Sequence, residues 1–291
     1  MRDDGRESEN VEDRRGDGNG SGGGFSLPFG NFRGMSIIAL VAALGAAYYF
    51  DIDPRTVLRF FESGSRSEIQ TQAPAKPIPA NDKQTKFVSV VLADTEDVWR
   101  ELLPKFGKRY SDPKLVLFRG QTPTACGRGR AAMGPFYCPA DRKIYIDLSF
   151  YDEMKTRYRA PGDFAQAYVI GHEVGHHVQN LMGTMGKVRR RQEGLSEAES
   201  NALSVKLELQ ADCYAGVWGF HADKARHILQ GGDIDEALGA ASAIGDDTLQ
   251  KRSGGTVVPE SFTHGSSAER VRWFKKGIQD GDLKACNTFK E

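Results

Sequence analysis

Two histidines four residues apart, with a glutamate directly after the first, constrain this chain more than any other part of its sequence. The stretch reads Gly171-His172-Glu173-Val174-Gly175-His176-His177. On a helix this spacing places His172 and His176 on one face, one turn apart. Two neutral imidazoles so placed can bind one Zn²⁺ ion, and Glu173 then lies beside the zinc-bound water and can take its proton. This is the H-E-x-x-H signature of zinc hydrolases, which a chain of this length matches by chance with a probability of about one per cent.

The residues around the motif predict the helix that it needs. Apolar side chains recur at helical spacing from residue 163 to residue 182. Gly171 and Gly175 lie inside this helix, where each costs about 1 kcal/mol relative to alanine. We therefore expect another backbone to approach the helix closely at these positions. His177 points about 100° away from His176, and we interpret it as a neighbour of the site rather than a further ligand.

The third zinc ligand has to come from elsewhere, because two imidazoles and a water leave one position open. One class of such enzymes has a third histidine six residues after the second, but that position here is Met182. In the apolar stretch 207–218, Glu208 and Asp212 fall on one helical face, and a buried carboxylate needs compensation. We interpret Glu208 as the third ligand and Asp212 as the acceptor that orients a ligand histidine, His172. The alternative is that both carboxylates pair with a lysine or arginine.

With these residues the chain resembles the bacterial family of neutral zinc metallopeptidases. The likeness is carried by His-Glu-Val-Gly-His-His at 172–177 and, about thirty residues on, by Glu-Leu-Gln-Ala-Asp-Cys-Tyr-Ala-Gly at 208–216. It extends over nearly the whole chain, through residues 134–139, 144–147 and 263–267. The resemblance implies a zincin-like fold with a glutamate third ligand, and a membrane anchor.

Composition divides the chain into a tail, an apolar run, a linker and a domain. Residues 1–34 are charged and Gly-rich and should be disordered, and the polar, Pro-containing residues 51–81 should be a linker. The remaining residues, 82–291, are long enough for one sizeable domain. We expect an α+β, zincin-like metallopeptidase domain, mainly helical with a small sheet. The 39 basic and 39 acidic side chains give zero formal charge, which argues against nucleic acid as the main partner.

Residues 35–50 form an uncharged apolar run of 16 residues, somewhat shorter than the roughly 20 that usually span a bilayer. The long start of mixed charge argues against a cleaved signal peptide, and the Tyr-Tyr-Phe end suits a membrane interface. We expect an uncleaved single-pass anchor in the bacterial inner membrane, with the N-terminus inside and the catalytic domain periplasmic or otherwise extracytoplasmic. A buried helix is the alternative, and the flanking arginines specify the orientation only weakly.

The domain sequence predicts several further elements. They are helices at 84–106, 233–250 and 265–279, strands at 115–118 and 143–148, and a helix carrying Glu208 that opens with the capping-box pair Ser196 and Glu199.

Two of the segments have competing interpretations. In zincin folds an edge strand before the motif helix pairs with extended substrate, and residues 143–148 are our candidate, with an ordinary internal strand as the alternative. The basic residues Lys187 and 189–191 lie in the connection between the two metal-bearing helices. We expect a solvated loop there, and contact with anionic lipid or substrate is the alternative.

Four cysteines are an even number, and their positions suggest Cys126 with Cys138 across a Gly-rich loop and Cys213 with Cys286 tying the C-terminus to the Glu208 helix. Outside the cytoplasm such disulfides persist. In the cytoplasm the four would be thiols, but the paired C-x-x-C spacing of soft-ligand zinc sites is absent.

The stretch from Thr263 to Arg270 places a histidine, His264, six residues before an arginine. It is similar to the His-Pro-x-x-x-x-Arg stretch of heat-shock and CAAX-processing membrane metalloproteases, with Gly265 in place of the proline. We predict that His264 donates a hydrogen bond to the oxyanion formed on carbonyl attack, with Arg270 in the same catalytic set. The alternative is that His264 caps the last helix or is exposed, and that Arg270 makes a surface ion pair.

These residues together predict a membrane-anchored zinc metalloendopeptidase. Zn²⁺ would be held by His172, His176 and Glu208, and Glu173 would activate the zinc-bound water for attack on a peptide bond. The alternative is a non-catalytic, membrane-tethered scaffold or binding protein with a structural zinc site. A structural site normally has four protein ligands, and the sequence supplies three.

Overall fold

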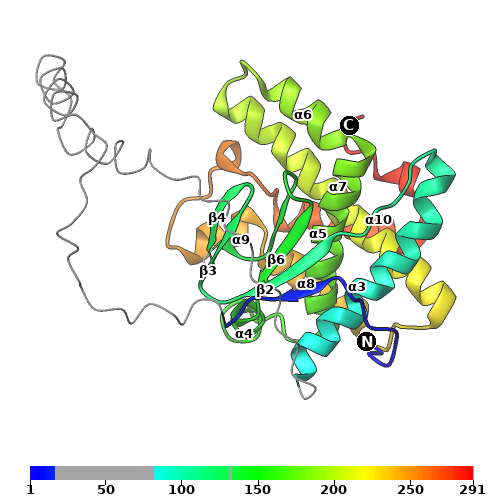
Figure 1. The fold of residues 1–291 in the computed structure, drawn as a ribbon. Coiled ribbons are helices and arrows are strands. Elements are labelled where there is room, and N and C mark those ends of the chain that lie inside the picture. The colour runs from blue at the N-terminus through cyan, green and yellow to red at the C-terminus, as the bar shows by residue number, and fades with distance from the viewer. Residues whose placement is uncertain (17–81, 131–132, 291) are drawn as a thin grey trace, which may run out of the picture. The chain divides into compact units, whose positions relative to one another are not determined.

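The structure, a computed structural model, describes residues 1–16, 82–130 and 133–290 (Figure 1). Its helices are α3 (Lys83–Leu102), α4 (Ser149–Thr156), α5 (Asp163–Met182), α6 (Thr184–Gln192), α7 (Glu197–Arg226), α8 (Asp233–Ala243), α9 (Asp246–Arg252) and α10 (Ser267–Asp280), with 3₁₀ turns η1 (Leu103–Phe106), η3 (Pro259–Ser261) and η4 (Leu283–Cys286). Its strands are β1 (Val11–Asp13), β2 (Lys114–Phe118), β3 (Gln121–Thr124), β4 (Gly127–Arg130), β5 (Phe136–Cys138) and β6 (Lys143–Asp147). The fold is therefore α+β and mainly helical, as predicted.

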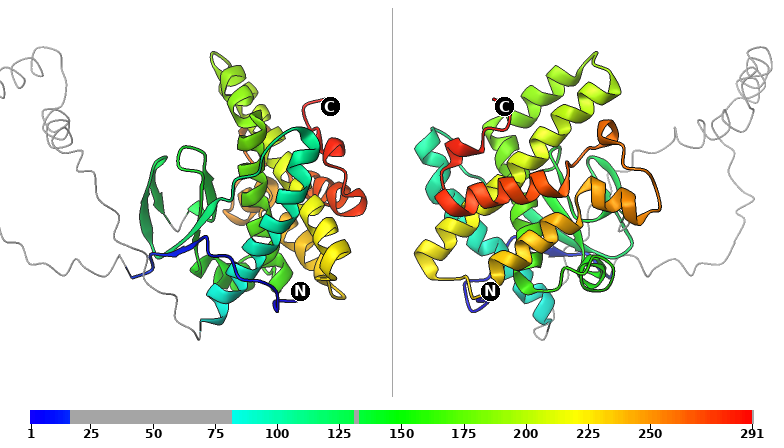
Figure 2. Two further views of the ribbon diagram at one scale, coloured as in Figure 1. Left: turned by 45° about the vertical axis from the view of Figure 1, so that its right-hand side comes forward. Right: turned by 180° about the vertical axis from the view of Figure 1, so that it is seen from behind.

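A four-stranded sheet lies along one side of the helices (Figure 2). Its order is β1-β2-β6-β5, with β1, β2 and β6 parallel and β5 antiparallel to β6. Because side chains alternate along a strand, Ile144 and Ile146 join the main core with the helices, while Tyr145 packs on the opposite face with Val116 and Phe118. The β3–β4 hairpin is a separate two-stranded sheet, joined to β5 by the Cys126–Cys138 disulfide.

Helix α5 is the buried centre of the helical body, with every residue from Ala167 to Gln179 buried. Helix α7 packs along it, and α10 packs on α7. Small residues allow the second crossing, because a Cβ on Gly216 of α7 would lie 2.6 Å from the Ile278 backbone nitrogen. A Cβ on Gly277 of α10 would meet the Cys213 carbonyl. The predicted Cys213–Cys286 disulfide then ties α7 to η4.

The predicted elements of the domain are found with some corrections. The helix at 84–106 corresponds to α3 and η1, the two strands to β2 and β6, and the motif helix to α5. The prediction of a single helix at 233–250 is wrong, because the segment forms two helices, α8 and α9, with α8 capped at Ile244. The break follows from Gly245, which has extended backbone and packs against the backbone at Ser267, where α10 begins.

The basic segment at 187–191 is not a loop but part of helix α6. The helix is held on α7, because the Gln192 amide donates to the Ser200 carbonyl and to the Ser204 hydroxyl, both at 3.0 Å. Arg189, Arg190 and Arg191 are exposed, as expected for a solvated segment.

The prediction of a disordered tail at 1–34 is wrong for residues 1–16. They belong to the compact unit that contains the domain, and β1 extends the sheet beside β2. Residues 1–16 are mostly charged, so their composition gave no sign that Met1 and Ser8 are buried in the folded unit. The rest of the tail, the apolar run 35–50 and the linker 51–81 lie outside the described residues. Among the residues described, no helix is long and apolar enough to span a bilayer.

Candidate metal centre

The motif helix α5 and helix α7 approach closely beside the histidines. A Cβ on Gly175 would lie 2.9 Å from the Ala211 carbonyl oxygen, and a Cβ on Gly171 would lie 2.7 Å from the Trp218 ring. The close approach expected at these glycines is therefore found, to a backbone at Gly175 and to an indole at Gly171. Ala211 lies between Glu208 and Asp212 in sequence, so this contact brings both carboxylates to the histidine face of α5.

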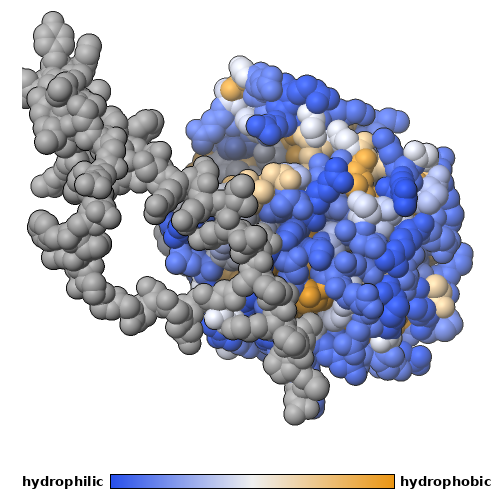
Figure 3. All heavy atoms as spheres, in the orientation of Figure 1, coloured by the Kyte–Doolittle hydropathy of each residue, from blue (hydrophilic) through white to orange (hydrophobic). Residues whose placement is uncertain are grey.

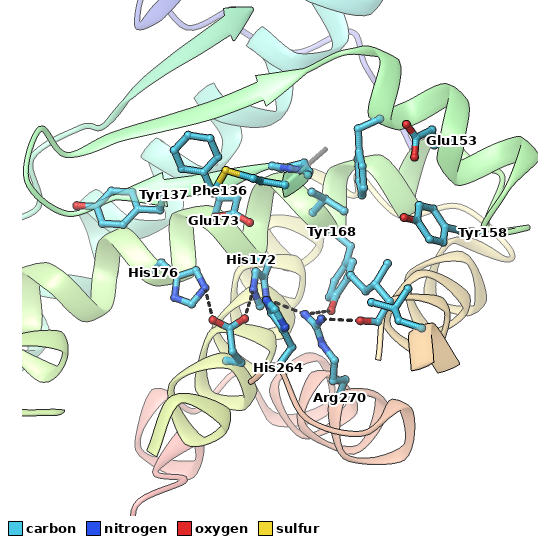
Figure 4. Close-up of a pocket in the computed structure, with 18 of the residues that line it drawn as sticks. Phe136, Tyr137, Glu153, Tyr158, Tyr168, His172, Glu173, His176, His264 and Arg270 are labelled. Atoms are coloured by element: carbon cyan, nitrogen blue, oxygen red, sulfur yellow. Dashed lines mark hydrogen bonds and ion pairs between the residues drawn. The ribbon is translucent and has the colours of Figure 1, made fainter. Parts of the chain in front are cut away.

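The three predicted ligands converge on one point. The Glu208 carboxylate lies 3.1 Å from His172 Nε2 and 3.3 Å from His176 Nε2 (Figure 4). The candidate ligand atoms of these residues all lie within 4.8 Å of one another. Two imidazoles and one carboxylate are a donor set that suits zinc with one coordination position left for water or substrate.

Hydrogen bonds at Nδ1 leave Nε2 of both histidines for a metal. His172 Nδ1 lies 2.7 Å from Asp212 Oδ1, and His176 Nδ1 lies 2.9 Å from Gln179 Oε1. Both partners are acceptors, so each ring donates from Nδ1. The Gln179 amide is itself fixed, because its nitrogen donates to the Leu207 carbonyl at 2.7 Å. The residues present therefore fit Zn²⁺, which they would hold through His172 Nε2, His176 Nε2 and Glu208.

The acidic partners strongly affect protonation of this cluster. Burial lowers the pKa of His172, but the negative charge of Asp212 and the hydrogen bonds that the ring donates to Asp212 and Glu208 raise it to about 10. Burial raises the pKa of Glu208, yet the neighbouring histidines hold it well below its usual value. A divalent cation must therefore compete with protons for this cluster.

Arg270 lines the same cavity as the ligands and pairs with Asp212. Its Nε and one terminal nitrogen each lie 2.9 Å from the Asp212 carboxylate oxygens, and the side chain is 3% exposed. The Tyr168 hydroxyl donates to Asp212 at 2.5 Å. Burial raises the pKa of Asp212, but Arg270 and His172 lower it to about 2. The contacts show that Arg270 positions Asp212, and its burial rules out the surface ion pair considered from the sequence. The catalytic role predicted for Arg270 stays a prediction.

Glu173 and the ligands open onto a cavity of about 650 Å³ (Figure 4). Burial raises the pKa of Glu173, while the charges of His172 and His176 act in the opposite direction. Much of the wall is aromatic or apolar and includes Phe136, Phe150, Tyr158, Val169, Ile244 and Leu249. A basic carboxylate beside such a wall is suited to proton transfer next to a bound organic ligand.

His264 lines the same cavity and is held by Asp246 at the start of α9. Asp246 Oδ2 accepts from the backbone nitrogens of Thr263, His264 and Gly265 at 2.7–3.1 Å, and its Oδ1 lies 3.2 Å from His264 Nδ1. The hydrogen bond that His264 donates to Asp246 raises the pKa of His264, against the effect of burial. With Nδ1 committed to Asp246, Nε2 is the nitrogen left to a ligand in the cavity.

The edge strand that borders the cavity is β5, and residues 143–148 form an internal strand, the alternative considered from the sequence. Strand β6 is internal between β2 and β5, whereas Phe136 and Tyr137 of β5 border the cavity. His177 holds β5 near α5, because its Nδ1 lies 3.0 Å from the Tyr137 hydroxyl and its Nε2 donates to the Ser111 carbonyl at 2.6 Å. Burial lowers the pKa of His177 to about 4, so it is a neutral, packed neighbour as interpreted.

Sequence reasoning missed three residues of this site. Tyr168 lies four residues before His172 and Gln179 three after His176, so helical spacing could have indicated both. Asp246 is far from every motif residue in the sequence, and no local signal pairs it with His264.

Comparisons with known proteins identify the family of the chain. The chain is 52% identical over 287 residues to "Uncharacterized protein YpfJ" of Escherichia coli (strain K12), covering 98% of this chain and 96% of that protein. It is 42% identical over 202 residues to "Uncharacterized protein Mb2605" of Mycobacterium bovis, covering 66% of each. No solved structure matches the chain. A family model described as "Putative neutral zinc metallopeptidase" matches residues 1–289, and the chain belongs to this family, whose cofactor is Zn²⁺.

Proposed function

We propose that this chain is a zinc metalloendopeptidase with a zincin-like fold, attached to a membrane. The observation that carries the proposal is the convergence of His172, His176 and Glu208 at the wall of a cavity that also holds Glu173 and His264. A site that binds a metal only for structure is normally closed by protein ligands. The opening of this one onto a 650 Å³ cavity favours catalysis over the scaffold alternative.

Each side chain then has a distinct task in peptide hydrolysis. Zinc, when bound, supplies a Lewis acid that polarises the substrate carbonyl and acidifies water. Glu173 accepts the proton of the attacking water and delivers it to the leaving amine. His264 donates from Nε2 to the developing oxyanion, and Asp246 keeps the ring oriented and protonated. Asp212 and Gln179 keep the two ligand histidines in the required tautomer.

The edge strand β5 gives a means of holding an extended peptide. Strand β5 pairs with β6 on one side, and a peptide can add to the other side through main-chain hydrogen bonds. Phe136 and Tyr137 of this strand line the cavity, so a substrate paired there passes the ligands. The aromatic and apolar wall favours a large apolar substrate side chain in the cavity.

The location of the enzyme is part of the proposal. The apolar run at 35–50 would attach it to the bacterial inner membrane. The two disulfides, Cys126–Cys138 and Cys213–Cys286, support an extracytoplasmic domain, because disulfides persist in oxidising compartments.

The test compares cleavage of a proteome-derived peptide library by the native protein, Glu173→Gln and Glu153→Gln. Glu153 is a matched control, because it lies at the same cavity but is 47% exposed and pairs with Arg157. Glu173→Gln should keep its zinc and lose at least about 100-fold in rate, whereas Glu153→Gln should stay active. Equal hydrolysis by the native protein and Glu173→Gln would contradict the mechanism. Zinc-loaded native protein that cleaves nothing would favour the scaffold.

A further inference from the structure

The first 16 residues are part of the catalytic domain's fold rather than a tail attached to it. Strand β1 pairs in parallel with β2, with Val11 opposite Leu115 and Asp13 opposite Leu117. The backbone contacts continue beyond the strand, since Ser8 N donates to the Ser89 carbonyl at 3.1 Å and the Ser89 hydroxyl returns a bond to the Ser8 carbonyl at 2.9 Å. Helix α3 and the sheet therefore both depend on this segment.

Buried charges of the domain find their partners in the same segment. The Glu96 side chain of α3 is 1% exposed and accepts hydrogen bonds from Ser8 at 2.5 Å, Asn10 at 2.9 Å and Arg6 at 3.0 Å. A buried carboxylate that lost these donors would be left uncompensated. At the other end of the segment, the Met1 amino group lies 2.8 Å from Asp163, the first residue of the motif helix α5.

The two ends of the connection 17–81 meet on the folded unit. Arg15, just before the connection, forms an ion pair at 2.7 Å with Asp82, just after it. Asp82 is also the N-cap of α3 and accepts from Thr85 N at 3.0 Å. The apolar run 35–50 lies between these two residues in the sequence. A single crossing of the bilayer by that run would place Arg15 and Asp82 on opposite sides of a hydrocarbon core about 30 Å thick.

We propose that residues 1–16 and the catalytic domain lie in the same compartment, on the same side of the membrane. Two crossings would return the chain to that side but need about 40 apolar residues, and the run has 16. Attachment through the run would then leave residues 1–16 and the domain on one face of the bilayer. With the domain extracytoplasmic, the N-terminus is extracytoplasmic too, in contrast to the predicted single-pass topology.

The described surface is consistent with attachment through a separate segment. The face in Figure 3 is predominantly hydrophilic. Among the described residues, the large apolar side chains that are exposed are Met133, Leu195, Ile234 and Val258, which belong to four different parts of the chain. Scattered single side chains do not form a membrane-binding patch.

This inference rests on the membrane attachment proposed above, and the experiment separates the two. The described residues contain no free cysteine, so Glu7→Cys and Lys108→Cys each place one exposed thiol, the first in the amino-terminal segment and the second after α3. A membrane-impermeant maleimide is applied to spheroplasts producing the full chain, before and after detergent. Both thiols should react to the same extent before detergent if both face outward. Reaction of one only after detergent would overturn the inference.

Fractionation supplies the second readout. The full chain should sediment with membranes, and replacement of residues 35–50 by an equal length of Gly and Ser should release it with unchanged melting temperature and peptidase rate. Native protein in the soluble fraction would overturn the attachment to the membrane, while leaving the proposed hydrolysis standing. A released variant that unfolds would show that the run belongs to the fold, which also contradicts the proposal.

Discussion

Gly175 of α5 lies against the backbone of Ala211 of α7, so closely that a Cβ on Gly175 would be 2.9 Å from the Ala211 carbonyl oxygen. Gly175 lies between the two ligand histidines, and Ala211 lies between Glu208 and Asp212. The spacing between the helices at this contact therefore sets how far the carboxylates are from the imidazoles. A glycine inside a helix lowers the stability of that helix, but at this position it permits the close approach that aligns the ligands.

Gly175→Ala should consequently destabilise the protein and weaken zinc binding. The added methyl must push α7 away, an overpacking that costs about 1–3 kcal/mol. Gly239→Ala is the matched control, because Gly239 lies inside α8 with nothing within 4 Å of an added Cβ. It should gain up to about 1 kcal/mol from helix propensity. Chemical denaturation and zinc titration of both variants test this, and equal stability of the two would contradict the alignment role.

Gln179→Leu should lower zinc affinity about 10- to 100-fold, because His176 loses the acceptor that fixes its tautomer. Glu208→Ala should lose the metal, having lost a ligand. Zinc affinity is measured by competition with a chromophoric chelator, and the melting temperature without metal controls for misfolding. Full zinc stoichiometry in Glu208→Ala would place the third ligand elsewhere.

Arg270→Met should destabilise the fold by about 3–5 kcal/mol, because it leaves the buried Asp212 carboxylate without its cation. The double variant Asp212→Asn with Arg270→Met should recover part of this lost stability, because it leaves no unpaired buried charge at the two positions. Urea denaturation of the three proteins measures the coupling. If the two substitutions are simply additive, Arg270 does not act through Asp212.

The pH dependence of turnover should report on His264 and Asp246. The hydrogen bond to Asp246 raises the pKa of His264, so the protonated ring persists to higher pH than an ordinary histidine and is lost as pH rises through the raised value. His264→Ala should lower kcat with KM and zinc content nearly unchanged. Asp246→Asn should move the alkaline limb of the pH profile of kcat to lower pH. Asp247→Asn is the control and should leave the limb in place, because Asp247 accepts a hydrogen bond from Ser267 and not from His264. If the alkaline limb of the pH profile of kcat stays in place in Asp246→Asn, protonation of His264 does not control turnover.

The sequence by itself determined the features that depend on local periodicity. Helical spacing put His172 and His176 on one face, grouped Glu208 with Asp212, and bounded the motif helix correctly at 163–182. Period-two alternation located β2 and β6, and the positions of the four cysteines suggested, among three possible pairings, the two disulfides that the structure contains. In each case the residues concerned repeat within a few positions, or are so few that the pairings can be enumerated.

Only the tertiary structure decided which distant residues meet. The sequence offered a surface ion pair as the alternative for Arg270, but the crossing of α7 and α10 buries its guanidinium against Asp212. Residues 143–148 were predicted as an edge strand or an internal strand, and the structure shows the internal one, with β1 and β5 at the two edges of the sheet. Sheet order depends on pairing between strands and not on any one strand's pattern. The charged residues 1–16 had the composition of a disordered tail. They fold because Glu96 and the edge of β2 offer partners that lie more than 80 positions away in the chain.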